Sequence, residues 1–248
     1  MAKVIVITGG SRGIGAATAL LAARQGYRVC INYLSDEESA MRVLAEVRAC
    51  GVHGIAVRAD ASNEDEVIRL FHRVDTELGA VTALVNNAAT IAEQSRVEEM
   101  SEFRLLKMMK NNIVGPMLCA KHAIHRMSTL HGGSGGTIVN VSSAAARLGA
   151  ANEYVDYAAS KGAIDTFTIG LSKELASEGV RVNAVRPGYI HTDFHSLSGD
   201  ANRVTKQESA LPMGRGGRPD EVAEAIVWLS SELSSYVTGT FIDLAGGR

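Results

Sequence analysis

The sequence has few cysteines, no excess of basic charge and no long apolar run. Its three cysteines, Cys30, Cys50 and Cys119, are odd in number and lack paired metal-ligand spacing, so we expect reduced, buried thiols. A formal net charge of -2 offers no basic surface to nucleic acid. No apolar stretch approaches the roughly 18 residues that a membrane-spanning helix requires. These absences argue against a disulfide scaffold, a nucleic-acid-binding protein and a membrane protein.

The amino terminus fits a protein that stays inside the cell. Lys3 leads directly into Val4-Ile5-Val6-Ile7, an apolar run that is too short for a signal peptide and is followed at once by glycines. We therefore expect a cytoplasmic protein. The 248 residues, 46% of them hydrophobic, suffice for one α/β domain with a sizeable core, and no linker, repeat or charge block divides them. We predict one domain over residues 1–248.

Short β-branched runs alternate with helical patterns almost from end to end. The runs predict strands near Val4–Thr8, Arg28–Tyr33, Gly54–Arg58, Ala83–Asn86, Gly136–Ser142, Arg181–Arg186 and Phe241–Asp243. The helical patterns lie near Ile14–Gln25, Glu37–Cys50, Glu64–Leu78, Glu102–Leu130, Val155–Glu178 and Pro219–Ser231. This alternation predicts βαβ units and an α/β fold, a single doubly wound Rossmann domain with a seven-stranded parallel sheet flanked by helices.

Residues 191–217 interrupt the alternation. They are rich in Ser, Gly, Asp and His and lack a clear period. Irregular segments of this length inside a compact domain are usually functional or disordered, so we expect a substrate lid. Its residues His191, Asp193, His195 and Arg203 could orient a polar substrate or simply lie in solvent. The two histidines resemble a metal-ligand pair, but without a third ligand we expect no metal.

The first predicted strand ends in TGGSRGIG, residues 8–15, and the first helix begins within it. Glycines let the turn close tightly and let a pyrophosphate approach the backbone, while the start of the helix supplies free N–H groups and partial positive charge. The place of this turn, after the first strand of a βα alternation, predicts dinucleotide binding. The missing Gly-Lys-Ser/Thr ending disfavours ATP or GTP. The expected cofactor contacts of the turn are Gly9, Ser11, Arg12, Gly13, Ile14 and Gly15.

The end of the second predicted strand bears on the choice of cofactor. An acidic side chain at this place binds the 2′-hydroxyl of NAD, but residues 32–35 read Asn-Tyr-Leu-Ser. Asp36 follows and is expected to cap the next helix. Arg12, inside the glycine turn, could pair with a 2′-phosphate, although it could also lie in solvent. We expect NADP(H) in preference to NAD(H).

Residues 157–161, YAASK, place a phenol and an ammonium four positions apart within a helical pattern. This spacing sets Tyr157 and Lys161 on one helix face, where such pairs are also common as surface neighbours. A phenol with a pKa of about 10 is a sluggish acid or base near neutral pH. A nearby cation favours the phenolate, so we expect Lys161 to lower the pKa of Tyr157 for general acid–base catalysis. Tyr154 has Ala158 four residues on and so lacks an equivalent cation in its own helix.

With both motifs located, the chain resembles the short-chain dehydrogenase/reductase family over essentially its whole length. The resemblance is closest to the glucose dehydrogenase-like and 3-oxoacyl carrier-protein reductase-like members. A series of motifs in the family's order is far more specific than any one of them. The series is TGGSRGIG, Asp60, Asn86-Asn87-Ala88-Ala89, Asn112, Ser142-Ser143, Tyr157 with Lys161, and Pro187-Gly188.

The resemblance implies further contacts to the cofactor. The residues that it assigns to the adenine ring are Asp60 and Ala61, those for the central strand and the adenosine ribose are Asn86 and Ala88, and those for the nicotinamide carboxamide are Pro187, Gly188, Ile190 and Thr192. The motif at residues 86–89 ends in alanine where the family usually has glycine. Because alanine is also small, we expect a slight shift of the backbone and retained binding.

The resemblance also implies a catalytic tetrad of Asn112, Ser143, Tyr157 and Lys161. Tyr157 would deliver the proton to a carbonyl oxygen, and Ser143 would help to hold that oxygen. Lys161 would bond the nicotinamide ribose, and Asn112 would position a water that relays protons from Lys161 to solvent. The expected function is an NADP(H)-dependent oxidoreductase that interconverts a carbonyl and a secondary alcohol on a small molecule.

Two of these assignments choose between adjacent residues. Family matching selects Ser143 over Ser142, since only one of two neighbouring side chains can face the site from a strand end. Asn112 is selected by its distance from Gly115, and we expect Asn111 to face elsewhere on the helix. The stretch from Ser143 to the catalytic tyrosine is one residue longer than in the carrier-protein reductases. The extra residue is expected within residues 148–156, where it could reshape the substrate mouth, with Arg147 and Glu153 as candidate mouth residues.

Substrate and partners remain open at this stage. Carrier-protein reductases often have a basic residue before the stretch that matches Gly179–Asn183, whereas this chain has Glu178, which would repel an acidic carrier protein. We therefore prefer a small diffusible ketone, alcohol or sugar and keep a 3-oxoacyl carrier-protein reductase as the alternative. A non-catalytic dinucleotide sensor is also possible, although sensors commonly lose the tyrosine or the lysine. A sugar-nucleotide epimerase usually needs a further carboxy-terminal region.

The apolar final stretch, residues 237–245, has two interpretations. It would be awkward as a free tail in water, and the resemblance suggests that it packs at a subunit interface in a homotetramer. Equally, a last strand that completes the sheet explains much of the same pattern.

Overall fold

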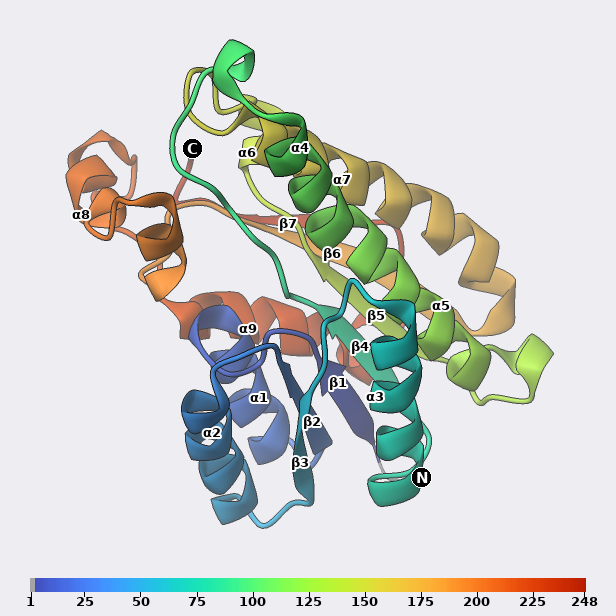
Figure 1. Cartoon of the computed structure of the whole chain (residues 1–248). Helices are drawn as coiled ribbons and strands as arrows, with labels where there is room; N and C mark the ends of the chain where they lie inside the picture. Colours follow the sequence, from blue (N-terminus) through green and yellow to red (C-terminus); the bar gives the residue numbers. More distant parts are fainter. Residues whose placement is uncertain (1–2) are drawn as a thin grey trace.

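Seven parallel strands form one continuous sheet in the order β3-β2-β1-β4-β5-β6-β7 (Figure 1). The computed structural model describes residues 3–248, apart from the side chain of His195. The strands are β1 (Val4–Ile7), β2 (Arg28–Tyr33), β3 (Gly54–Arg58), β4 (Ala83–Asn86), β5 (Gly136–Val141), β6 (Val180–Pro187) and β7 (Phe241–Leu244). The predicted doubly wound parallel fold is therefore confirmed.

Helices cover both faces of this sheet (Figure 1). One face packs against α1 (Gly13–Arg24), α2 (Glu37–Ala49) and α9 (Pro219–Leu229). The other packs against α3 (Glu64–Glu77), α5 (Gly115–Met127) and α7 (Val155–Leu175). The shorter helices are α4 (Glu102–Met109), α6 (Ala145–Leu148) and α8 (Arg203–Gln207). Single helical turns lie at η1 (Val97–Glu99), η2 (Lys110–Val114), η3 (Thr129–His131), η4 (Ala176–Glu178), η5 (Asp193–Ser198), η6 (Glu208–Ala210) and η7 (Glu232–Ser234).

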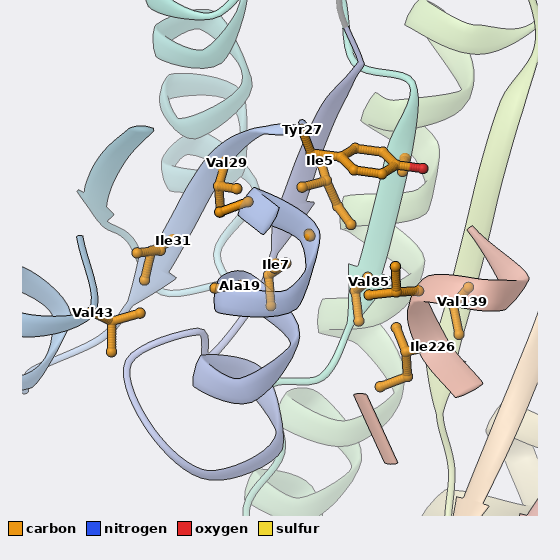
Figure 2. Close-up of a cluster of buried hydrophobic side chains, with 14 of the residues drawn as sticks. Ile5, Ile7, Ala19, Tyr27, Val29, Ile31, Val43, Val85, Val139 and Ile226 are labelled. Atoms are coloured by element: carbon orange, nitrogen blue, oxygen red, sulfur yellow. The ribbon is translucent and has the colours of Figure 1, made fainter. Parts of the chain in front are cut away.

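The central strands are apolar on both sides because each side faces a layer of helices. Along β1, Ile5 and Ile7 belong to the cluster under α1, α2 and α9, which Figure 2 shows in part. Val4 and Val6 belong to the cluster under α3, α5 and α7. Strands that are buried on both faces appear in the sequence as unbroken apolar runs, which is why the sequence predicts them. The two cores hold the strand ends, and so the site above them, in fixed positions.

Polar side chains fix where two of the helices begin. Asp36 accepts a hydrogen bond from the backbone N–H of Ser39 at 3.0 Å and caps α2, as the sequence predicts. Asn63 caps α3 in the same way through the N–H of Glu66. Both helices carry acidic residues in the first turn, which the helix dipole stabilises.

Two predicted elements differ from the structure. The single helix expected over Glu102–Leu130 is interrupted by the π-helical turn η2 and ends at Met127, after which Ser128 starts a separate turn. The segment 191–217, expected to be irregular, contains η5, α8 and η6. Turns this short do not display a helical period, and single-turn π-bulges occur inside longer helices, so the sequence pattern on either side still indicates helix. At the other end of the chain, β7 pairs with β6 and completes the sheet.

Two of the three cysteines are buried as expected, and one is not. Burial raises the pKa of the Cys119 thiol to about 12 and raises that of Cys30 as well. Cys50 follows α2 on the surface and is exposed, so the expectation of a buried thiol is wrong there. Among residues 3–248, no helix combines the length and apolarity needed to cross a bilayer.

The packing of β4 can be tested by removing one side chain. Leu84 is 0% exposed at the centre of the sheet, and Leu84→Ala is expected to lower the free energy of unfolding by about 2–5 kcal/mol, because it removes buried methyl groups and leaves a cavity. Denaturant unfolding followed by circular dichroism measures the loss. Leu130, 76% exposed, is the matched control, and Leu130→Ala should change stability by less than about 0.5 kcal/mol. Equal losses in the two variants would contradict the described core.

Candidate active site

A cavity of about 530 Å³ opens above the carboxyl ends of the strands. It lies where the strand order turns from β1 to β4, the crevice in which open parallel sheets bind ligands. Its volume is in the range typical of small-molecule and cofactor sites. Of the site residues that the sequence predicts, all line this cavity except Gly15, Asn86 and Asn112.

The glycine turn between β1 and α1 needs its glycines for different reasons. Gly9 and Gly13 have φ values of +61° and +54°, the left-handed region that other residues rarely adopt. A Cβ on Gly15 would lie 2.4 Å from the carbonyl oxygen of Gly9, so this position must be glycine for the helix to approach the turn. Gly15 therefore supports the cradle from within rather than facing the cavity.

Two asparagines that the sequence analysis did not assign hold this turn. Asn87 Nδ2 donates to the carbonyl oxygens of Thr8 and Gly9 at 2.9 and 3.0 Å, and its side chain lines the cavity. Asn32 Oδ1 accepts from the Gly9 N–H at 3.4 Å, and its Nδ2 donates to the Ala59 carbonyl at 2.9 Å. Each has a side-chain amide at or directly after the end of a buried strand, Asn32 in β2 and Asn87 after β4, and this position is the signal in the sequence that could have identified them.

Asn86, the neighbour of Asn87, points into the protein. Its Nδ2 donates to Asn140 Oδ1 at 2.9 Å and to the Pro116 carbonyl at 3.1 Å. It thus ties β4 to β5 and α5, which agrees with support of the central strand. The expected ribose contact is wrong for Asn86, because its side chain is buried and does not line the cavity; Ala88 does line it.

The side chain of Arg12 lies at the other end of the turn, exposed beside the cavity. Leu34, Ser35 and Asp36 border the same region after β2. The pKa of Asp36 is lowered, chiefly by the hydrogen bonds from Ser39 and to a smaller extent by the positive charge of Arg12. One oxygen of the carboxylate is thus engaged in capping α2, while Arg12 lines the cavity and is exposed.

Asp60 and Ala61 follow β3 and form the next part of the wall. The Asp60 carboxylate accepts from the N–H and the hydroxyl of Ser62 at 2.8 and 2.7 Å. These two bonds fix its orientation at the strand end.

Tyr157, Lys161 and Ser143 come together at the far end of the cavity. The Lys161 ammonium lies 5.6 Å from the centroid of the Tyr157 ring and donates to the Val141 carbonyl at 2.7 Å. Ser143 lies near the Tyr157 hydroxyl, whose pKa it lowers, and accepts from the Ala145 N–H at 3.1 Å. The strand end and the helix thus bring a hydroxyl, a phenol and an ammonium to one place.

Burial decides how these groups ionise. It raises the pKa of Tyr157 to about 12, and Ser143 offsets only part of that rise. The net shift of the Tyr157 pKa is therefore upward, opposite to the lowering that the sequence leads us to expect from Lys161. Burial also lowers the pKa of Lys161 to about 8, against the opposing effect of Asp165. The phenol is thus protonated at neutral pH. The pKa of the lysine lies much closer to neutral pH than that of the phenol.

The two adjacent serines face different partners. Ser142 Oγ donates to Asp165 Oδ1 at 2.6 Å, whereas Ser143 lies near the Tyr157 hydroxyl. This is the alternation expected at a strand end.

The two adjacent asparagines of η2 are placed differently from the prediction. Asn112 is fully buried, where its Oδ1 accepts from the Thr90 N–H at 2.8 Å and its Nδ2 donates to the Thr90 carbonyl and to Ser160 Oγ at 2.9 and 3.1 Å. Asn111 lines the cavity, so the expectation that it faces elsewhere is wrong. The π-helical turn rotates the chain between them. The amide of Asn112 joins the segment after β4 to α7.

The end of β6 and the residues after it lie against the glycine turn, residues 8–15. Pro187, Gly188, Ile190 and Thr192 all line the cavity, and the Thr192 methyl lies 3.2 Å from where a Cβ on Gly13 would stand. This stretch therefore lies against the same cradle that the glycines form.

An ion pair forms part of the cavity wall where the sequence predicts the substrate mouth. Arg203 of α8 has a side chain that is only 7% exposed, and it pairs with Glu153 from the loop before α7. Its guanidinium lies 4.9 Å from the ring centroid of Tyr154 and 5.5 Å from that of Tyr189. Both partners of the pair line the cavity.

The region of the expected extra residue has an unusual backbone. Ala150 and Asn152 have φ values of 46° and 62°, which are uncommon for residues other than glycine. Glu153 lines the mouth as anticipated, but Arg147 does not, because it pairs with Asp243 at 3.3 Å instead.

The histidines of the segment give no indication of a metal site. His191 Nε2 lies 2.9 Å from Glu208 Oε1, and the side chain of His195 lies outside the described part of the structure. Among the described side chains, no three His, Cys, Asp or Glu residues are grouped as metal ligands.

The cavity fits a nicotinamide dinucleotide. A glycine cradle at the start of a helix suits a pyrophosphate, and a Cβ at Gly9 or Gly15 would close it against Ala88 and the turn itself. The cavity then continues from the turn to Tyr157 and Lys161 without interruption. The glycine turn lines one part of this cavity, and the phenol of Tyr157 and the ammonium-bearing Lys161 line another.

Comparison with known proteins agrees with this arrangement. A family model described as Enoyl-(Acyl carrier protein) reductase matches residues 9–248. The chain is 50% identical over 245 residues to the Uncharacterized oxidoreductase YgfF of Escherichia coli (strain K12), covering 99% of each. It is 37% identical over 256 residues to a Glucose and ribitol dehydrogenase homolog of Oryza sativa subsp. japonica, covering 99% of this chain and 85% of that protein.

A solved structure is similar over the same length. A short-chain type dehydrogenase/reductase from Mycobacterium marinum matches with a TM-score of 0.92 at 31% identity, covering 99% of this chain and 94% of that one. The chain belongs to the short-chain dehydrogenase/reductase family and is an NAD(P)-dependent oxidoreductase acting on CH–OH/C=O groups.

Proposed function

We propose that the protein is an NADP(H)-dependent enzyme that interconverts a carbonyl and a secondary alcohol on a small molecule, with Tyr157 as the acid and base. One observation carries the proposal. The Tyr157 hydroxyl, near Ser143 and beside Lys161, stands in the same cavity as the glycine cradle. Such a cavity holds a cofactor at one end and a proton donor at the other.

The bound nicotinamide supplies or accepts the hydride. The residues of the chain manage the proton and the oxygen. A carbonyl that is being reduced develops negative charge on its oxygen, which hydrogen-bond donors stabilise. With a pKa of about 12, Tyr157 holds its proton at neutral pH and delivers it to that oxygen, while Ser143 donates a second bond.

Lys161 and Asn112 support this proton transfer. The Lys161 ammonium, anchored on the Val141 carbonyl, places positive charge beside the ring in which a phenolate would form. Its pKa of about 8 allows it to exchange protons near neutral pH. Asn112 holds Ser160, the residue before Lys161, to the segment after β4. Since its amide donors are engaged there, the proposed relay water requires other atoms of this turn.

The preference for NADP(H) rests on the surroundings of Arg12. Arg12 and Ser35 both line the cavity, and Asp36, whose pKa the charge of Arg12 helps to lower, accepts from the N–H of Ser39. A 2′-phosphate in this region would meet a cation, while a 2′-hydroxyl would find Asp36 already engaged.

The mouth favours a small polar substrate. Tyr154, Tyr189 and Phe194 supply aromatic wall, and the pair of Arg203 with Glu153 supplies both donors and acceptors. Such a mixture suits an alcohol, a ketone or a sugar. A 3-oxoacyl group on a carrier protein is the alternative, and Glu178, which accepts from Ser128 Oγ, leaves an acidic side chain where a basic one would attract such a partner.

A cytoplasmic homotetramer completes the proposal. Phe103, Leu106 and Met117 are exposed along α4 and α5, and β7 forms one edge of the sheet. Apolar side chains gathered on neighbouring helices are typical of subunit interfaces.

Replacement of Tyr157 tests the proton transfer. Tyr157→Phe is expected to lower kcat by about 10²–10⁴-fold, the usual contribution of general acid–base catalysis, with cofactor affinity nearly unchanged. Steady-state kinetics and fluorescence titration of NADPH measure the two effects. Tyr154→Phe removes a phenol that bonds Ser198 Oγ instead and should lose less than about tenfold. Wild-type turnover in Tyr157→Phe would reject the assignment.

Replacement of Arg12 tests the cofactor preference. Arg12→Ala removes a charged partner of a 2′-phosphate and should weaken NADPH by about 10–100-fold while leaving NADH almost unaffected. Arg24, exposed at the other end of α1, is the matched control, and Arg24→Ala should alter neither affinity. Equal losses for both cofactors in Arg12→Ala would remove the basis of the preference.

A substrate panel tests the proposed function as a whole. Ketones, secondary alcohols, sugars and a 3-oxoacyl carrier protein are each assayed with NADPH or NADP⁺ and with NADH or NAD⁺, by absorbance of the reduced nicotinamide. We expect turnover of small carbonyls or alcohols and higher kcat/KM with the phosphorylated cofactor. A complete blank with intact cofactor binding would favour the sensor alternative.

A further inference from the structure

A buried carboxylate lies one helical turn beyond Lys161. Asp165 of α7 accepts from Ser142 Oγ at 2.6 Å and from Arg186 Nε at 2.9 Å, one bond to each carboxylate oxygen. Ser142 Oγ also lies 3.3 Å from the Lys161 carbonyl oxygen. Ser142, the serine beside Ser143, thus joins the strand end to the turn of helix that carries the lysine.

This carboxylate is held rigidly and away from solvent. The Asp165 side chain is 12% exposed, and the Arg186 side chain is 16% exposed. Arg186 in turn packs its guanidinium 3.9 Å from the ring centroid of Phe241 and lies 3.9 Å from Asp243. A charge with so little contact with water acts on its neighbours more strongly than a surface charge does.

The other charged groups around α7 are engaged elsewhere. From α4, Arg104 bonds Asp156 at 2.8 Å, near the start of α7. From α6, Arg147 pairs with Asp243 of β7 at 3.3 Å. Lys110 of η2 is exposed to solvent.

On the side of Lys161, the remaining groups are Tyr157, Asp165 and, from β6, Arg186. Asp165 is therefore the carboxylate of α7 that belongs to the lysine's own surroundings.

We propose that Asp165 is a positioning residue of the reaction: held by Ser142 and Arg186, its negative charge keeps the buried Lys161 ammonium charged and in place beside Tyr157. The inference rests on the proposed function, since it concerns the same proton transfer. It assigns a role to Asp165, Ser142 and Arg186.

The direction of the effect follows from the charges. Burial disfavours the charged form of Lys161 and lowers its pKa to about 8, while Asp165 favours the charged form and raises it. Removal of the Asp165 charge should therefore lower the pKa of Lys161 further. At neutral pH a larger fraction of the lysine would then be neutral, and the phenolate would lose its neighbouring cation.

The test measures Lys161 directly in the protein without cofactor. NMR titration of protein labelled with [¹³Cε]-lysine follows each lysine against pH, and the signal missing in Lys161→Met identifies Lys161. In Asp165→Asn the titration midpoint should fall by about one pH unit, a tenfold weaker hold on the proton. In Asp165→Glu, which keeps the charge, the midpoint should stay close to that of the unmodified protein.

Asp243→Asn is the matched control. It removes one carboxylate from the same group of charges, but one that contacts Arg186 and Arg147 rather than the helix of Lys161. Its Lys161 midpoint should move by less than about 0.3 pH unit. If Asp165→Asn does not fold, as judged by thermal unfolding, Asp165→Ser supplies a second uncharged side chain at the same place.

Kinetics gives a second readout. The pH profile of kcat for Asp165→Asn should shift in the same direction as the Lys161 midpoint, whereas a purely structural role would lower kcat at every pH alike. An unshifted midpoint in Asp165→Asn or Asp165→Ser overturns the inference and leaves the proposed function standing. Wild-type turnover in Tyr157→Phe would reject the proposed function without moving the Lys161 midpoint.

Discussion

The hydrogen bond from the Lys161 ammonium to the Val141 carbonyl joins the two parts of the molecule on which the site depends. Val141 ends β5, the strand that leads into Ser143, and Lys161 lies in α7, the helix that presents Tyr157. A buried ammonium costs free energy unless it is paired, so this bond fixes the helix against the strand end. The relative placement of serine, phenol and lysine follows from that one constraint.

Side-chain amides hold the rest of the site in the way that the lysine holds its centre. Asn87 and Asn32 form hydrogen bonds to the glycine turn. Asn86 links β4 to β5 by a hydrogen bond, and Asn112 links the segment after β4 to α7. Each spans elements that the chain order separates. An amide offers a donor and an acceptor together, which suits strand ends where backbone groups have no further strand to pair with.

The strands and the two main motifs could be predicted from the sequence because local patterns encode them. Strands apolar on both faces and a glycine turn after the first of them are visible as runs of residues. Contacts between distant segments are not visible in this way. Tyr154 lacks a cation in its own helix, yet Arg203 of α8 lies over its ring. Likewise, the π-helical turn changed which of Asn111 and Asn112 reaches the cavity, and burial reversed the expected change in the phenol's pKa.

The isolated parallel bridge between Ile190 and Gly217 joins the two ends of the segment 191–217. The N–H of His191 donates to the Gly217 carbonyl at 2.9 Å, and the N–H of Gly217 donates to the Tyr189 carbonyl at 2.8 Å, so both ends of the 191–217 segment are fastened at one place. Because its two ends meet, the segment is a closed loop that leaves the rest of the fold at one point. The same loop carries Thr192, which lies against the glycine turn, and Arg203, which lines the cavity beside Tyr154, so a single excursion of the chain supplies wall to two parts of the cavity.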